Sequence, residues 1–211
     1  MNPAPLPASG PLISVVLPTF QAAVCIEGAL ESLAAQTWRG FEVVVSDGAS
    51  MDGTLECVRA WSHALPALTV SSRRDAGVYD AINQGVRLSR GAWFLVLGAD
   101  DRLHASSALG EVAAVLQDAQ ALTGPAAGVE VIHGDVRMMA TNQTGTPAGE
   151  RYAGPMPLER LLRTNVCQQA IFYRRSLFDA LGGFDLRYPL HADWQFNVRA
   201  ALRHPFHWVD V

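Results

Sequence analysis

Asp100 and Asp101 are adjacent carboxylates that follow a short apolar run, and their type and spacing suggest metal chemistry. In a turn, two neighbouring carboxylates can converge on one ion. Proteins typically hold Mg²⁺ or Mn²⁺ with one or two carboxylates together with substrate phosphates. The same two residues could instead cap the helix that the pattern predicts from Ala105. On these residues alone, both interpretations stay open.

Other polar side chains also come directly after apolar runs. Asp47 lies in an Asp-Gly turn, where it could accept hydrogen bonds from a base or a ribose, or could simply form the turn. Arg73 and Arg74 could bind phosphate bidentately or could form a solvated charge cluster. Six further candidates for substrate contacts, or for holding loops, are Thr19, Asp75, Tyr79, Asp80, Gln168 and Gln169.

Asp193 lies near the start of a predicted helix over 192–202. The positive end of the helix dipole favours a carboxylate at that place. A capping role and a chemical role are both compatible with this position, and the residue alone does not decide between them.

The elements that must position these residues alternate between strands and helices. Such alternation predicts an α/β fold with a mainly parallel central sheet flanked by helices on both faces. Ligands of these sheets sit at the carboxyl ends of the strands, which places the polar residues above at one edge. Predicted strands cover 13–17, 41–46, 68–71 and 93–97, and predicted helices cover 22–36, 54–63 and the stretch through Val78, Ile82 and Val86.

The second half of the chain is less regular, and we interpret the whole as one domain. Residues 1–11 read as a flexible Pro-rich tail, 12–101 as a ligand-binding half and 102–211 as a second half that completes the site. Because the chain ends within a strand-like pattern, a truncation at the C-terminus is one interpretation. Predicted elements here are helices at 105–121, 157–163, 175–181 and 192–202, short strands within 129–140, at 170–173 and 206–211, and a polar loop at 142–149.

Composition excludes several classes of protein. The 16 basic residues are all Arg, so neither a Schiff-base lysine nor a P-loop lysine exists. A net charge of −4 argues against a nucleic-acid partner, and no apolar run approaches the roughly 20 residues of a membrane-spanning helix. Three widely spaced cysteines favour a reducing compartment, which predicts a cytoplasmic location.

The combination of motifs resembles the family 2 inverting glycosyltransferases, which have the GT-A nucleotide-sugar fold. Within that family the likeness is to enzymes that assemble bacterial exopolysaccharide or glycolipid, and it covers about residues 13–199. The residues that carry it are ISVVLPTF at 13–20, VVVSDGASMDGT at 43–54, RDAGVYDAINQGVRLSRGAWFLVLGADD at 74–101, GGFD at 182–185 and the acidic helix start at Asp193.

This resemblance implies a role for several residues. Thr19 and Asp47 would contact the nucleoside, Arg74 would lie near the base or diphosphate, and Asp100 would approach the ribose and the sugar. The donor would be a nucleotide-sugar, most commonly a UDP-sugar.

The resemblance also implies how the reaction would proceed. Asp101 would bind a divalent metal, Mn²⁺ or Mg²⁺, and Asp193 would deprotonate the acceptor hydroxyl, which would belong to a glycan or a lipid-linked glycan. A lipid-linked acceptor would place the protein at the inner face of the cell membrane as a peripheral protein. Two positions differ from the common family pattern: Ala192 stands where Glu is frequent, and Gln168 stands where many relatives carry His.

Three other functions are alternatives to this one. A sugar nucleotidyltransferase usually needs a Gly-rich phosphate loop after the first strand, where this chain has Pro18 and Thr19. A Rossmann dehydrogenase needs a GxGxxG motif there. A non-catalytic nucleotide-sugar-binding domain would bind nucleotide and transfer nothing.

Overall fold

The computed structural model describes residues 10–121, 128–139, 148–152 and 154–210. Over these residues one domain is built on a seven-stranded sheet of order β3-β2-β1-β4-β8-β5-β9, and β6 pairs with β7 in a separate ribbon. The elements are β1 (Ile13–Thr19), α1 (Ile26–Ala34), β2 (Phe41–Asp47), α2 (Thr54–Ala60), β3 (Leu68–Ser72), α3 (Val78–Leu88), β4 (Trp93–Val96), α4 (Ala108–Ala121), β5 (Val131–His133), β6 (Val136–Arg137), β7 (Arg151–Tyr152), α5 (Leu158–Leu161), a 3₁₀ turn η1 (Gln168–Ala170), β8 (Ile171–Arg174), α6 (Arg175–Leu181), α7 (Ala192–Ala201) and β9 (Phe206–Trp208).

The sheet is mainly parallel, as the alternating pattern predicts. Strands β3, β2, β1 and β4 run parallel to one another, whereas β8 runs antiparallel between β4 and β5. The pattern of short apolar runs did not reveal this reversal. Because β8 is reversed, its first residue, Ile171, lies at the same edge as the ends of β4 and β5. Both halves of the chain therefore deliver loops to one edge of the sheet.

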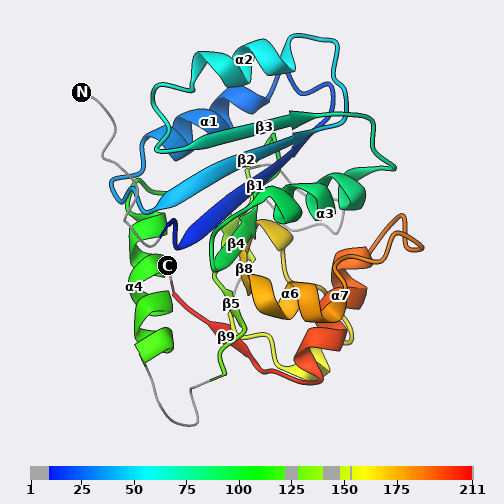
Figure 1. The fold of residues 1–211 in the computed structure, drawn as a ribbon. Helices are drawn as coiled ribbons and strands as arrows, with labels where there is room; N and C mark the ends of the chain where they lie inside the picture. The colour runs from blue at the N-terminus through cyan, green and yellow to red at the C-terminus, as the bar shows by residue number, and fades with distance from the viewer. Residues whose placement is uncertain (1–9, 122–127, 140–147, 153, 211) are drawn as a thin grey trace.

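Helices cover both faces of the sheet (Figure 1). Side chains of a strand point alternately to opposite faces. Val15 and Leu17 of β1 accordingly pack in one buried cluster with α1, α2 and α4, while Val16 packs in a second cluster with α3, α6 and α7. The continuous apolar sequence of β1 follows from this burial on both sides.

Two helices begin later than predicted, and hydrogen bonds explain both differences. The backbone carbonyl of Ala22 accepts from two following N–H groups in a turn, so α1 begins at Ile26. Buried Gln36 donates to the carbonyl of Ala105 at 2.8 Å and accepts from the N–H of Leu109, so the chain before α4 is held as a turn. The predicted tail and the polar loop at 142–149 lie largely outside the described residues.

Gly85 lets α3 approach the sheet closely. A Cβ at this position would lie 2.5 Å from Cγ1 of Val16, which is fully buried and cannot move aside. Gly85→Ala gains up to about 1 kcal/mol of helix propensity, but overpacking costs about 1–3 kcal/mol. We expect a net loss of stability, seen as a melting temperature lower by a few degrees, on the order of 2–4 °C per kcal/mol.

Gly28→Ala in α1 is the matched control. A Cβ there meets only the far end of the Arg102 side chain, at 3.2 Å, and that exposed guanidinium is free to shift. The melting temperature of Gly28→Ala should stay equal or rise. If both variants raised it alike, close packing of α3 would not be the reason for glycine at position 85.

Candidate active site

Asp47 ends β2 and organises three strand ends. Its carboxylate accepts four hydrogen bonds: from the Thr19 hydroxyl at 3.0 Å, from the Ser50 N–H and hydroxyl at 2.9 and 2.6 Å, and from the Ser72 hydroxyl at 2.6 Å. Burial by itself would raise the pKa of Asp47, but these hydrogen bonds outweigh it and the pKa is lowered. A carboxylate has about four lone-pair sites. A nucleobase could therefore donate a hydrogen bond to Asp47 only if one of the hydroxyl donors rotated away.

The loop between β3 and α3 is held by its own side chains. Arg73 donates to the side chain of Gln84 at 2.5 Å, and Gln84 donates to Asp80 at 3.0 Å. Asp80 also accepts a backbone N–H of the loop, so in this structure it holds the loop. The carboxylate of Asp75 lies over Gly48, in the turn after β2. A Cβ added at Gly48 would lie 2.7 Å from Oδ2 of Asp75. Arg74 is exposed in this loop.

Asp100 and Asp101 converge on Gly98, beyond the end of β4. A Cβ added at Gly98 would lie 2.6 Å from Oδ2 of Asp101 and 3.1 Å from Oδ1 of Asp100. Burial and the neighbouring Asp100 charge raise the pKa of Asp101. Neither residue caps α4, which begins at Ala108. The capping alternative for this pair is therefore wrong.

The donor set at this turn fits a metal bound together with a diphosphate. Over the described parts of the chain, no three His, Cys, Asp or Glu side chains come together as a ligand set. Mg²⁺, however, is commonly held by one or two carboxylates plus phosphates and water rather than by an all-protein cage. Two carboxylates are crowded over one glycine, the pKa of one of them is raised, and neither forms an ion pair within the described residues. A divalent cation would offset their mutual repulsion.

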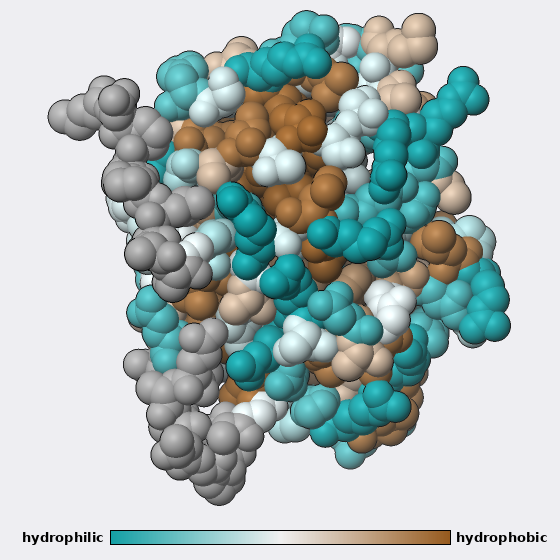
Figure 2. All heavy atoms as spheres, viewed as in Figure 1, coloured by the Kyte–Doolittle hydropathy of each residue, from teal (hydrophilic) through white to brown (hydrophobic). Residues whose placement is uncertain are grey.

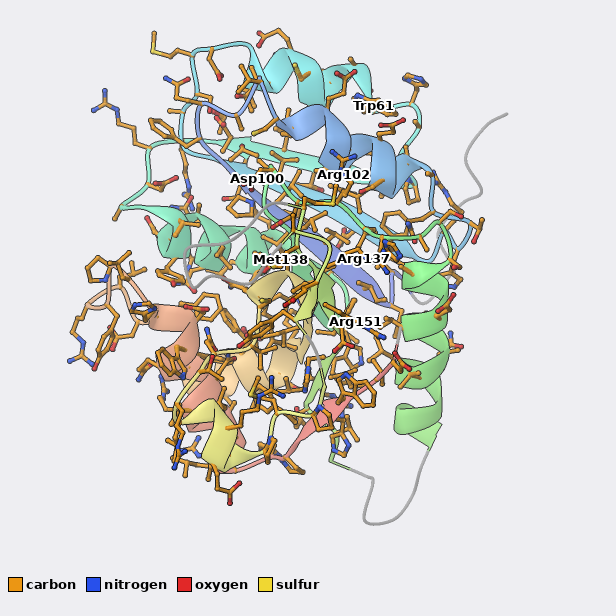
Figure 3. All side chains as sticks on the ribbon, turned by 180° about the vertical axis from the view of Figure 1, so that it is seen from behind. Trp61, Asp100, Arg102, Arg137, Met138 and Arg151 are labelled. Carbon is orange, nitrogen blue, oxygen red and sulfur yellow. The ribbon has the colours of Figure 1, made fainter. Side chains whose placement is uncertain are left out.

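Two glutamines reach this edge from the other half of the chain, because β8 is reversed. Gln169 lies in η1, and its side-chain nitrogen is 3.5 Å from Oδ1 of Asp101. The side-chain nitrogen of Gln168 is buried and has no hydrogen-bond partner among the described residues. Figure 3 labels Asp100 and Arg102 on the loop after β4, and Arg137 and Met138 at the end of β6.

Asp193 lies in the first turn of α7 and is only 8% exposed. The cap position of the helix is His191, whose φ of 64° is left-handed, so the capping interpretation of Asp193 is wrong. Its carboxylate instead accepts from two other parts of the chain. The Tyr79 hydroxyl of α3 donates to Oδ1 at 2.5 Å, and the Asn165 amide donates to Oδ2 at 2.6 Å.

A second layer of side chains continues from Asn165. The Asn197 side-chain amide donates to the side-chain Oδ1 of Asn165 at 2.9 Å, and the Tyr173 hydroxyl donates to the side-chain Oδ1 of Asn197 at 2.7 Å. Sequence reasoning missed these three residues. The only available signal was that Asn197 stands four residues after Asp193, on the same face of the helix.

The surface beside Asp193 combines charged and apolar side chains. Hydrophilic residues gather over the loop between β3 and α3, where Arg73 and Arg74 are exposed (Figure 2). The loop between α6 and α7 carries exposed Leu186 and Leu190 together with Arg187.

The mainly parallel sheet, with carboxylates at one edge and loops from both halves, defines a protein of the GT-A nucleotide-sugar fold. The chain belongs to glycosyl transferase family 2, because the model of that family matches residues 14–182. The family and fold expected from the sequence motifs are thereby confirmed, and the protein is a glycosyltransferase.

Relatives among characterised sequences and solved structures agree with this. The chain is 40% identical over 193 residues to the PGL/p-HBAD biosynthesis glycosyltransferase of Mycobacterium tuberculosis, covering 90% of this chain and 70% of that one. Among solved structures, Staphylococcus aureus TarS 1–349 in complex with UDP has a TM-score of 0.75 at 24% identity over 94% of this chain. The mannosyltransferase PcManGT of Pyrobaculum calidifontis, in complex with GDP-Man and Mn²⁺, has a TM-score of 0.67 at 24% identity over 99% of this chain. This chain spans 57% of each of those two chains, and at these identities the likeness concerns the fold.

Proposed function

We propose that this chain transfers a sugar from a nucleoside-diphosphate donor, a UDP-sugar in the first instance, to an acceptor hydroxyl with inversion at the anomeric carbon. The observation that carries the proposal is the placement of Asp193. Its buried carboxylate is tied to α3, and α3 starts directly after the loop that bears Arg74 and Asp75. A proton acceptor thus lies close in the fold to the edge at which such sheets bind their ligands.

The donor would bind at the carboxyl ends of β1 to β4. Thr19 and Asp47 would contact the nucleoside, Arg74 would pair with the diphosphate, and Asp100 would approach the ribose and the sugar. The complexes of TarS with UDP and with UDP-GlcNAc, and of PcManGT with GDP-Man, support a nucleotide-sugar as the donor.

Asp101, helped by Asp100, would hold a divalent cation, Mn²⁺ or Mg²⁺. When bound, this ion would offset the negative charge that develops on the departing diphosphate. The crowded carboxylates at Gly98 and the Mn²⁺ in the PcManGT complex support this assignment. Gln168 and Gln169 would offer amide groups to the sugar or the acceptor.

Asp193 would act as the general base. It takes the proton of the acceptor hydroxyl while that oxygen forms a bond to the anomeric carbon and the bond to the diphosphate oxygen breaks on the opposite face of the sugar. The incoming and departing groups occupy opposite faces, so the configuration inverts.

The acceptor would be a glycan or a lipid-linked glycan. The M. tuberculosis relative named for PGL/p-HBAD biosynthesis and the exposed leucines beside Asp193 support an acceptor with an apolar part. No helix in the described parts of the chain is long and apolar enough to cross a membrane. The cytoplasmic location and the contact with the membrane face stay predictions.

Thermal stability tests donor binding directly. UDP, GDP and dTDP should each be added with and without Mn²⁺, and one of them, UDP first, should raise the melting temperature in the presence of the metal. At 100 times its dissociation constant a ligand stabilises by about 2.7 kcal/mol, which corresponds to about 5–10 °C at this size. A folded protein that shifted with none of the three would contradict the proposal. Binding without transfer to any acceptor would instead identify a nucleotide-sugar-binding domain.

A further inference from the structure

We propose that Tyr79 and Asn165 are positioning residues, which fix the orientation of the Asp193 carboxylate. This inference rests on the proposed function of Asp193 as the base. Each carboxylate oxygen receives one short hydrogen bond, from a different part of the chain, at 2.5 and 2.6 Å. Each oxygen keeps a further lone pair for an acceptor hydroxyl.

The direction of each hydrogen bond in the series from Asp193 through Asn165 and Asn197 to Tyr173 follows from the ionised Asp193 carboxylate. An ionised carboxylate only accepts, so Asn165 must turn its NH₂ group toward it. The Asn165 oxygen then faces Asn197, which must donate, and the Asn197 oxygen in turn accepts from Tyr173. Asn197 is fully buried, so reversing any link would set two acceptors or two donors against each other away from water.

Tyr79 is a permanent donor to Asp193. Its ring packs edge-on against the ring of Phe184, with 5.5 Å between the two ring centroids, and this packing fixes the direction of the hydroxyl. Burial, the hydrogen bond to Asp193 and the charge of Asp193 together raise the pKa of Tyr79, so it keeps its proton throughout the physiological range. A donor that never ionises holds the carboxylate oxygen of its partner in one place.

The other titratable groups that face Asp193 do not compete with this role. Burial, together with the Asp193 charge, raises the pKa of Tyr173 on β8. His191 is exposed and precedes Asp193 on the same segment. Asp193 takes part in none of the ion pairs found among the described residues. Neutral donors therefore surround the carboxylate.

The split between kcat and KM separates positioning from simple support of the fold. Tyr79→Phe and Asn165→Ala should each lower kcat about tenfold, since a hydrogen bond to a charged group is worth roughly that factor. The KM for donor should stay unchanged. Tyr188→Phe is the matched control: Tyr188 is 44% exposed, and its hydroxyl has no hydrogen bond among the described residues.

A second readout needs no activity. The carbon-13 chemical shift of the Asp193 carboxyl group, assigned with Asp193→Asn, should change in Tyr79→Phe and Asn165→Ala, because each variant removes a hydrogen bond to one carboxylate oxygen. A chemical shift that stays where it is in wild type would overturn the inference, as would an unchanged kcat in variants that merely melt earlier. Full activity of Asp193→Asn would instead overturn the proposed base, whatever the carboxyl chemical shift showed.

Discussion

Replacing Asp193 by Asn is expected to reduce turnover by about 10²- to 10⁴-fold, the usual contribution of a general base. The amide can still accept from Asn165 and can donate to the Tyr79 oxygen, so both neighbours keep a partner and the fold should persist. Asp193→Ala would leave two partly buried donors without this partner and would confound stability with chemistry. Nucleotide binding should stay at the wild-type level, because this residue lies on α7 and not at the strand ends.

The measurement is single-turnover transfer, with the nucleotide dissociation constant determined on the same samples. Asp185→Asn is the matched control. It lies on the loop before α7, where its pairing with Arg187 lowers its pKa to about 2, and its carboxylate accepts hydrogen bonds from the Arg187 guanidinium of the same loop. Its turnover should match wild type. An equal loss of nucleotide binding and turnover in Asp193→Asn would make Asp193 a structural residue.

The first half of the fold, through β4, was readable from the sequence because its signals are local. A strand buried on both faces must be continuously apolar, which is how β1 and β2 read, and an Asp-Gly turn marks the end of β2. The direction of β8 was not readable in this way. Its apolar run is the same in either direction, and only pairing with β4 and β5 makes it antiparallel.

The residues of the candidate site also fall into those with a local sequence signal and those that only packing brings together. Asp47 and the pair Asp100 and Asp101 could be assigned to one edge because each directly follows a strand. The partners of Asp193 could not be found, since Tyr79 and Asn165 lie 114 and 28 residues away from it along the chain and meet it only through packing. The four hydrogen bonds to Asp47 could not be predicted either, because no sequence pattern distinguishes Ser50 and Ser72 from other serines.

Asp101→Asn is expected to abolish the metal-dependent part of nucleotide binding while leaving the ligand-free protein as stable as wild type or more so. The hydrogen bonds to this carboxylate are long, 3.2 Å from the Gly98 N–H and 3.5 Å from Gln169, so little is lost when one oxygen becomes an amide. Removing the charge also relieves its repulsion by Asp100. A functional carboxylate held at a cost to stability is typical of binding sites.

The sign of the effect follows from linkage between protonation and folding. The folded state raises the pKa of Asp101, so it binds the proton more tightly than the unfolded chain, and the ionised group costs stability once the pH has risen through the folded pKa. Asp47 is the opposite case. Its pKa is lowered, so its contribution is present above the unfolded pKa and is lost as the pH falls through the folded one.

Asp47→Asn therefore makes a strict comparison for Asp101→Asn. At neutral pH it should lower the melting temperature of the ligand-free protein, by about 4–8 °C if about 2 kcal/mol of charge-assisted hydrogen bonding is lost. The two substitutions remove the same charge at ends of two strands in one sheet, yet their effects on stability should have opposite signs. Thermal melts of both variants at neutral pH, with and without Mn²⁺ and nucleotide, measure both the sign of the stability change and the response to metal. A large loss of stability in ligand-free Asp101→Asn, or an undiminished response to metal, would place the cation elsewhere.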